Sequence, residues 1–319
     1  MLIGVQFLIG VHVKIKLADY VISWLSSKGV KTIFTVSGGG SIVLCDALFD
    51  QSKIRYICCH HEQSVAFAAE GVSRSGKDLG VGLVTTGPGG TNTLTGLAGA
   101  WIDSVPMLII SGQAFLSQTI GNSGVRQLGV QESDMVEMSK SVTKFSKMVE
   151  NPNDIRDILE ESFFLATTGR PGPVLIDIPV DIQNSFIEIE KLNDNFKANF
   201  PEYEISSYQE KILIKKLDKS QRPILHIGHG AKKDDAFKDI IDFAVLHNIP
   251  IMTTWNATDL VPSDNTMFVG RPGAFAERAA NFNIQNCDLY ISIGSRLPYM
   301  VTGYNKKDFA RNAYKIIVD

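Results

Sequence analysis

The fold of the first part of the chain is decided by residues 79–113, which read LGVGLVTTGPGGTNTLTGLAGAWIDSVPMLIISGQ. An apolar run breaks at Gly87-Pro88-Gly89-Gly90, a helical pattern of small residues follows, and a second apolar run closes the stretch. Two strands joined through a helix form a βαβ unit, and such units build parallel sheets. Open sheets of this kind bind ligands at the carboxyl ends of their strands. The glycine break is therefore the first candidate binding site.

The same alternation continues on both sides of this unit. Strand-like runs occupy residues 31–36, 54–59, 80–86, 106–111 and 172–179, and helical patterns occupy 17–28, 41–50, 62–76, 91–104 and 152–168. The strand-like runs are almost continuously apolar, which is typical of strands buried on both faces of a parallel sheet. We therefore expect a doubly wound α/β domain, with the run 54–59 as one of its buried strands.

A second alternating set follows a polar stretch. Its strand-like runs are residues 222–228, 249–255, 288–294 and 314–319, and its helical patterns are 234–248 and 277–286. The expected fold class is therefore α/β, with two doubly wound parallel-sheet domains at 16–187 and 209–319 and an interdomain linker at 188–208. Residues 1–15 are expected to be an N-terminal extension, with the natural start at Val13.

Composition argues against several classes of partner. The 319 residues carry a formal charge of −3 with Lys and Arg scattered along the chain, which argues against nucleic acid and anionic membranes as partners. The apolar start is shorter than the ~20 residues that span a bilayer. The four cysteines form no CxxC pair. We expect reduced, structural cysteines in a cytoplasmic protein, and no metal site within the chain.

The glycine break alone leaves two alternatives, a ligand-binding loop and a tight turn. A dinucleotide fingerprint would need glycine at Asn92, and the Lys-Ser/Thr ending of a P-loop is missing. A phosphate cradle is therefore not the natural interpretation. Glu62 also has two alternatives, because an acidic residue in the first turn of a helix interacts favourably with the helix dipole whether or not it has a function.

Taken together, several motifs resemble one family. HEQSVAFAAEG (61–71), TTGPGGTN (85–92), MLIISGQ (107–113), GRPGPVLIDIPVDIQ (169–183) and YKIIVD (314–319) stand in the order and spacing of thiamine-diphosphate-dependent enzymes of the acetolactate synthase type. The resemblance implies that residues 16–187 form the pyrimidine-binding domain and that 209–319 form the flavodoxin-like central domain. It also implies a third domain that holds the diphosphate and Mg²⁺ with a Gly-Asp-Gly motif. That motif is absent from this sequence, so we expect a truncated chain that is inactive by itself.

The resemblance assigns roles to residues of the first domain. Glu62 matches the carboxyl group that exchanges a proton with the pyrimidine ring so that the cofactor can lose its thiazolium C2 proton. Pro88 and Asn92 match positions that contact the pyrimidine, and Gln113 matches a catalytic glutamine near the reacting carbons. Gly38 and Gly39 stand in the cofactor-binding stretch, where this chain has Val36-Ser37-Gly38-Gly39 and the family usually has Tyr-Pro-Gly-Gly. The glycine loop would then expose its backbone to a flat ring.

The resemblance also raises the question of a flavin in the second domain. The family's flavin-lining positions match Gly228, Gly230, Thr254, Arg271, Gly273, Gly294 and Arg296. The family's Asp-Asp-Arg after Arg296 is replaced by Pro298-Tyr299-Met300. FAD binding and a packing role for the glycines therefore stay open as alternatives, since glycines follow strands in many domains of this class.

Three functions are compatible with the sequence. The first is acetolactate synthase-like chemistry, in which pyruvate is decarboxylated and joined to a second keto acid. The second is acetyl transfer from pyruvate to a keto-sugar, and the third is a non-catalytic module that binds flavin or a partner. In the family the active sites lie between subunits, so we expect a homodimer or tetramer that associates through the helices at residues 62–76 and 92–103.

Overall fold

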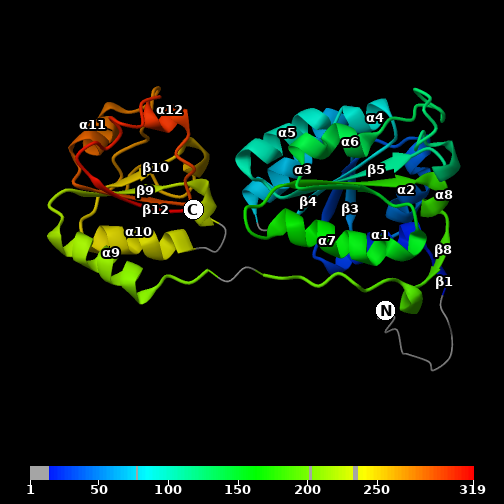
Figure 1. Cartoon of the computed structure of the whole chain (residues 1–319), viewed down its shortest axis with the longest axis horizontal. Helices are drawn as coiled ribbons and strands as arrows, with labels where there is room; N and C mark the ends of the chain where they lie inside the picture. The colour runs from blue at the N-terminus through cyan, green and yellow to red at the C-terminus, as the bar shows by residue number, and fades with distance from the viewer. Residues whose placement is uncertain (1–13, 77, 201–202, 233–235) are drawn as a thin grey trace. The chain divides into compact units, whose positions relative to one another are not determined.

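The computed structural model describes residues 14–76, 78–200, 203–232 and 236–319. Of the expected extension at residues 1–15, residues 1–13, including the expected start at Val13, lie outside the described residues, whereas Lys14 and Ile15 belong to a short strand of unit 1. The chain divides into two compact units, residues 1–201 and 202–319, and each unit is described by itself (Figure 1).

Unit 1 alternates strands and helices along the sequence. Its strands are β1 (Lys14–Lys16), β2 (Thr32–Thr35), β3 (Arg55–Cys58), β4 (Gly80–Val84), β5 (Met107–Gln113), β6 (Phe145–Met148), β7 (Pro173–Pro179) and β8 (Phe186–Glu188). Its α-helices are α1 (Leu17–Ser27), α2 (Ile42–Phe49), α3 (Glu62–Ser75), α4 (Pro88–Thr91), α5 (Leu94–Asp103), α6 (Met135–Ser139), α7 (Ile155–Thr167) and α8 (Val180–Gln183).

Among the described residues of unit 1, six strands form a parallel sheet in the order β3-β2-β4-β5-β7-β6. The chain moves outward from β2 to β3 and then returns past β2 to β4. The direction of winding therefore reverses between β2 and β4. In doubly wound sheets, ligands bind at the carboxyl ends of the strands at such a reversal.

Helices cover both faces of this sheet (Figure 1). On one face α1, α2 and α7 share a hydrophobic core with inward side chains such as Leu108 and Ile176. On the other face α3, α5 and α6 pack against side chains such as Ile109 and Leu175. Every residue of β4, β5 and β7 is buried, as the apolar runs predict for central strands.

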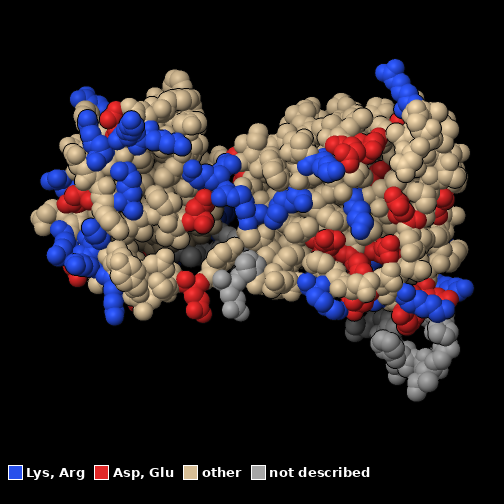
Figure 2. Space-filling view, viewed as in Figure 1, with Lys and Arg blue, Asp and Glu red and all other residues tan. Residues whose placement is uncertain are grey.

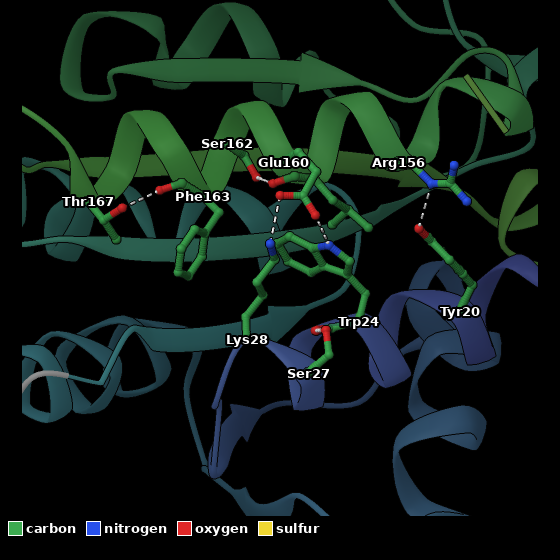
Figure 3. Close-up of polar contacts among 10 residues, drawn as sticks. Tyr20, Trp24, Ser27, Lys28, Arg156, Glu160, Ser162, Phe163 and Thr167 are labelled. Carbon is green, nitrogen blue, oxygen red and sulfur yellow. Dashed lines mark hydrogen bonds and ion pairs between the residues drawn. The ribbon is translucent and has the colours of Figure 1, made fainter. Parts of the chain in front are cut away.

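Polar contacts join the helices α1 and α7 (Figure 3). The Trp24 indole N–H donates to Glu160 Oε1 at 2.8 Å, and Lys28 Nζ donates to Glu160 Oε2 at 2.7 Å. Lys28 also lies 5.3 Å from the centroid of the Phe163 ring. One carboxylate of α7 thus fixes the last turn of α1 and the residue that follows it.

The expectation of a buried strand at residues 54–59 is wrong. β3 is an edge strand of the sheet, and the Cys58 side chain is exposed. The Tyr56 ring packs instead against Phe49 of α2, with the centroids 4.5 Å apart. The run is apolar, but the winding places it at the end of the strand order, where one side has no neighbouring strand. The edge strand β6 and the antiparallel β1–β8 pair were not predicted.

Unit 2 contains a second parallel sheet. Its elements are α9 (Ser207–Lys219), β9 (Pro223–Ile227), α10 (Ala236–Leu246), β10 (Ile251–Thr253), α11 (Arg278–Asn286), β11 (Leu289–Ile293), α12 (Tyr299–Thr302) and β12 (Tyr314–Val318). The described strands have the order β10-β9-β11-β12. Side chains of α9 and α10 cover one face, and those of α11 and α12 cover the other. Both units are therefore doubly wound α/β folds, as the sequence predicts.

Part of the polar stretch predicted as a linker packs on unit 1. The backbone N–H of Asn195 donates to Asp157 of α7 at 2.9 Å. The rings of Phe196 and Phe200 lie 5.7 and 5.2 Å from that of Phe164. This stretch follows the surface of α7 as far as Phe200. Although it is mostly polar and charged, its two phenylalanines attach it to unit 1.

The surface carries both signs of charge. On the face shown in Figure 2, acidic and basic side chains are present on each unit. Within the described ranges, no helix is long and apolar enough to cross a membrane. The same residues contain no group of three or more His, Cys, Asp or Glu side chains that could hold a metal ion.

Candidate functional site

The candidate site of unit 1 lies where the loops after β2 and β4 meet. An ideal Cβ added to Gly38 would lie 2.6 Å from the Cβ of Thr85, and the Gly40 N–H donates to Thr85 Oγ1 at 3.1 Å. No side chain fits at Gly38 because the two loops are in contact. Gly39 is exposed, and a Cβ added there would meet nothing within 4 Å. The backbone is therefore open at Gly39.

Glu62 is held in place by Asn92. Glu62 is the first residue of α3 and is half-buried. The Asn92 side-chain amide donates to Glu62 Oε2 at 2.8 Å, and Glu62 Oε1 lies 3.5 Å from an ideal Cβ on Gly89. His61 caps the helix, since its Nδ1 accepts from the Gln63 N–H at 3.1 Å. One carboxylate oxygen is thus fixed by an amide, and the other lies next to the glycine loop.

The glycine loop is packed against protein, and the expectation of exposed backbone is wrong for Gly87, Gly89 and Gly90, which are buried. An ideal Cβ would lie 2.1 Å from Gln131 O at Gly87, 2.6 Å from Thr85 Cγ2 at Gly89 and 2.8 Å from Met135 Cγ at Gly90. Neighbouring loops fill the space that side chains would occupy. Pro88, the first residue of α4, is the exposed part of the loop.

Gln113 is buried beneath this loop, with 2% of its surface exposed. Its Nε2 donates to Asp177 Oδ2 and to Ser133 O, both at 2.9 Å. Its Oε1 accepts from Thr86 Oγ1 at 2.6 Å and from the Ala114 N–H at 2.9 Å. All four hydrogen-bonding positions of the amide are used within the protein. A direct role near the reacting carbons stays a prediction.

Gln131 also belongs to the site, and the sequence did not predict its backbone geometry. It has a φ of 58°, which is uncommon for a residue other than glycine. Its carbonyl oxygen occupies the position beside Gly87 that a side chain would fill. Glu132, the next residue, accepts from the N–H groups of Ile120 and Leu128 and so holds the preceding loop closed. The sequence shows that Gln131 and Glu132 are adjacent, but it does not reveal a positive φ.

In unit 2 the predicted flavin-lining glycines contact each other. The winding reverses between β9 and β11, and Gly228 and Gly294 follow these strands. An ideal Cβ on Gly228 would lie 2.0 Å from Gly294 O, and one on Gly294, whose φ is 65°, would lie 2.3 Å from Ala231 N. The Gly230 N–H donates to Gly294 O at 3.0 Å. Close packing of two loops accounts for these glycines without a ligand.

The remaining flavin candidates lie in nearby loops. The Thr254 N–H donates to Ile227 O at 2.9 Å, and Arg296 is exposed. Arg271 pairs with Glu277, with Nη1 3.0 Å from Oε1. Gly273 has a φ of 139°, and an ideal Cβ there would lie 2.4 Å from a backbone carbonyl oxygen. Contacts within unit 2 thus explain Thr254, Arg271 and Gly273 without a ligand.

Comparison with known proteins identifies both units. Residues 15–138 match the N-terminal TPP binding domain of thiamine pyrophosphate enzymes, and residues 211–319 match the central domain of the same enzymes. The chain belongs to the thiamine pyrophosphate enzyme family. The site at Glu62 and Asn92 lies within the first match, and the loops after β9 and β11 lie within the second.

Several curated relatives of this thiamine pyrophosphate enzyme chain are acetolactate synthases. It is 36% identical over 306 residues to the probable acetolactate synthase large subunit of Methanocaldococcus jannaschii, covering 95% of this chain and 50% of the relative. It is 35% identical over 304 residues to acetolactate synthase isozyme 2 large subunit of Escherichia coli, with 95% and 53% covered. It is 35% identical over 306 residues to the chloroplastic acetolactate synthase of Arabidopsis thaliana, with 95% and 44% covered. The chain thus spans about half the length of the curated relatives it matches.

Proposed function

We propose that this chain supplies the pyrimidine-activating side of a thiamine-diphosphate site of the acetolactate synthase type. The observation that carries the proposal is the Glu62 carboxylate, with Oε2 held by the Asn92 amide at 2.8 Å and Oε1 beside the glycine loop. The residues fit an aminopyrimidine ring, because the exposed Pro88 and the open backbone at Gly39 belong to adjacent loops, and a carboxyl oxygen of Glu62, at the start of α3, lies beside one of them. The relatives named acetolactate synthase support this chemistry over the other two functions.

The residues divide the work at the pyrimidine. The chemistry that bound thiamine diphosphate supplies is nucleophilic attack on the carbonyl carbon of a 2-keto acid. Glu62 holds or releases a proton at Oε1, because its other oxygen already accepts a hydrogen bond. Asn92 orients the carboxyl group, and α3 fixes the position of its backbone. Gly39 and Pro88 provide surfaces against which a flat ring can rest.

The diphosphate and Mg²⁺ would be held by residues outside these 319, since the sequence has no Gly-Asp-Gly motif. The reaction proposed for the completed site is decarboxylation of pyruvate and transfer of the two-carbon unit to a second keto acid. This makes the completed enzyme a transferase with a lyase step. FAD in unit 2 is also part of the proposal, although the packing of Gly228 and Gly294 does not require it. The visible absorption spectrum of the purified protein decides between a flavin site and packing alone.

Binding of the cofactor to this chain is expected to be weak and independent of Mg²⁺. We expect the amide NMR signals of Gly39 and Asn92 to shift on addition of thiamine diphosphate and equally with thiamine, because only the pyrimidine has partners here. Glu62→Ala should abolish the shifts. The control Glu210→Ala, which removes an exposed carboxylate from the first turn of α9, should retain them. Micromolar, Mg²⁺-dependent binding would contradict the proposal.

We also propose that the helices α3 and α5 form a subunit interface, which would put Glu62 near a second chain. Both helices present large apolar side chains to solvent, with Phe67 45% and Trp101 43% exposed. Between the helices the packing is tight, since an ideal Cβ on Gly96 would lie 2.4 Å from Ala66 Cβ. The two helices therefore form one closely packed apolar surface, of the kind that becomes buried when subunits associate.

A homodimer or tetramer is expected in solution, and Phe67→Glu should shift it toward monomers. A glutamate there places an unpaired charge in an apolar interface, and obligate interfaces bury on the order of 2,000 Å² or more. Sedimentation equilibrium measures the change. The control is Phe186→Glu, at a residue of β8 that is 65% exposed and lies outside both helices. A wild-type chain that is monomeric at all concentrations would refute the interface.

A further inference from the structure

A buried polar chain connects the centre of the sheet to the glycine loop. Asp177 lies in the middle of β7 and is 1% exposed. Its Oδ1 accepts from Ser111 Oγ at 2.6 Å, and its Oδ2 accepts from Gln113 Nε2 at 2.9 Å. Gln113 Oε1 in turn accepts from Thr86 Oγ1 at 2.6 Å. Thr86 is the residue immediately before Gly87, so three side chains lead from β7 to the start of the loop.

The direction of these hydrogen bonds fixes the Gln113 amide. Its nitrogen donates to two acceptors, Asp177 and the carbonyl oxygen of Ser133, and its oxygen accepts from two donors. Rotating the amide by half a turn would set its oxygen against two acceptors and its nitrogen against the Ala114 N–H. The acceptor on Asp177, together with the Ser133 carbonyl and the Ala114 N–H, therefore determines which atom of Gln113 faces Thr86.

We infer that Asp177 is a positioning residue, which acts through Gln113 and Thr86 to hold the glycine loop against Glu62. The chain of contacts ends at Thr86, and the loop carries Gly89, whose ideal Cβ lies 3.5 Å from Glu62 Oε1, and then Asn92, which holds Oε2. The importance of this geometry for catalysis rests on the proposed function. The positioning itself concerns only the fold of unit 1.

The carboxyl group does not need its charge for this role. Burial raises the pKa of Asp177 to about 7, opposed by the hydrogen bonds from Ser111 and Gln113 and aided by the nearby carboxylate of Asp134. A proton on Oδ1 can be accepted by Ser111 Oγ, which leaves Oδ2 free to accept from Gln113. Asparagine can make the same two contacts, with its amide nitrogen toward Ser111 and its oxygen toward Gln113.

Hydrogen exchange of the loop tests the inference in the chain as it is. The Thr91 and Asn92 amides, which donate to Gly87 O at 2.9 Å and Pro88 O at 3.1 Å, should exchange about tenfold faster in Asp177→Leu, the loss expected for one buried hydrogen bond. Asp177→Asn should restore the wild-type rate. Ser111→Ala removes the partner of the other carboxylate oxygen. It should leave the exchange rates of the loop amides unchanged when they are compared with those of the β4 amides.

Thr86→Val provides a second test that leaves the sheet intact. It removes the hydroxyl at the loop end of the Asp177–Gln113–Thr86 network while keeping the branched shape of the side chain. The loop amides should therefore exchange faster, as they do in Asp177→Leu. Loop exchange at the wild-type rate in Thr86→Val, or exchange that is equally fast in Asp177→Asn and Asp177→Leu, would overturn the inference. Since no cofactor is present in these measurements, a failure of thiamine diphosphate to bind would refute the proposed function and leave this result standing.

Discussion

Replacing Glu62 with glutamine is expected to slow proton exchange at the cofactor's C2 carbon by about 10²–10⁴-fold, the usual contribution of a placed proton-transfer group. Glutamine has the same shape and keeps an oxygen that accepts from the Asn92 amide, a bond of 2.8 Å in the present protein. Its nitrogen would stand in place of Oε1 and can neither take nor return a proton there. The fold should survive, because the position is the first residue of α3 and is half-buried.

The rate of deuterium incorporation at C2 is measured by NMR. The protein used has to contain the part of the site that holds the diphosphate as well as this chain. Glu210→Gln is the matched control, because it makes the same change in the first turn of α9 and should leave the rate unchanged. Thermal unfolding of both variants separates loss of fold from loss of chemistry. An exchange rate in Glu62→Gln within a factor of two or so of the wild type would remove Glu62 from its proposed role.

The sequence was sufficient for the central strands of both sheets and for their order along the chain, but not for β1, β6, β8 and α9. The apolar runs at residues 80–86, 106–111 and 172–179 became the fully buried strands β4, β5 and β7, because central strands of a parallel sheet must be apolar on both sides. It was misleading at β3. Local composition shows that a run is apolar, but the exposure of Cys58 and Tyr56 depends on which strand lies beside it, and that is decided by the crossovers.

The site could be predicted only in part, for a similar reason. The motifs place Glu62 at the start of a helix and Asn92 at the end of the glycine loop, and the structure joins them by a hydrogen bond. The packing of the loop could not be read from the sequence, because Gln131 meets Gly87 only through the fold and adopts a positive φ there. Asp177 did leave a signal, since a single carboxylate in the apolar run LIDIP requires buried partners.

The second large effect is expected from Gly87→Ala, which should destabilise unit 1 by about 3 kcal/mol, a typical sum of backbone strain and a steric clash. Gly87 has a φ of 60° and a ψ of −123°, a backbone conformation that residues other than glycine rarely adopt. An ideal Cβ would also lie 2.1 Å from the carbonyl oxygen of Gln131. That atom is backbone and cannot rotate away, so the loop or the residue before Glu132 has to move.

The matched control is Gly39→Ala, because both glycines stand in the loops of the same site. A Cβ at Gly39 meets nothing within 4 Å, so the free energy of unfolding should change by no more than ~0.5 kcal/mol, as for ordinary surface substitutions. Urea unfolding of the two variants measures the difference.

Gly39→Ala should nevertheless weaken the NMR shifts caused by thiamine, because the new methyl group projects from the backbone proposed to face the pyrimidine. If both substitutions cost the same stability, the loop after β4 is not closed by Gln131. If Gly39→Ala changes neither stability nor binding, the pyrimidine does not rest on Gly39.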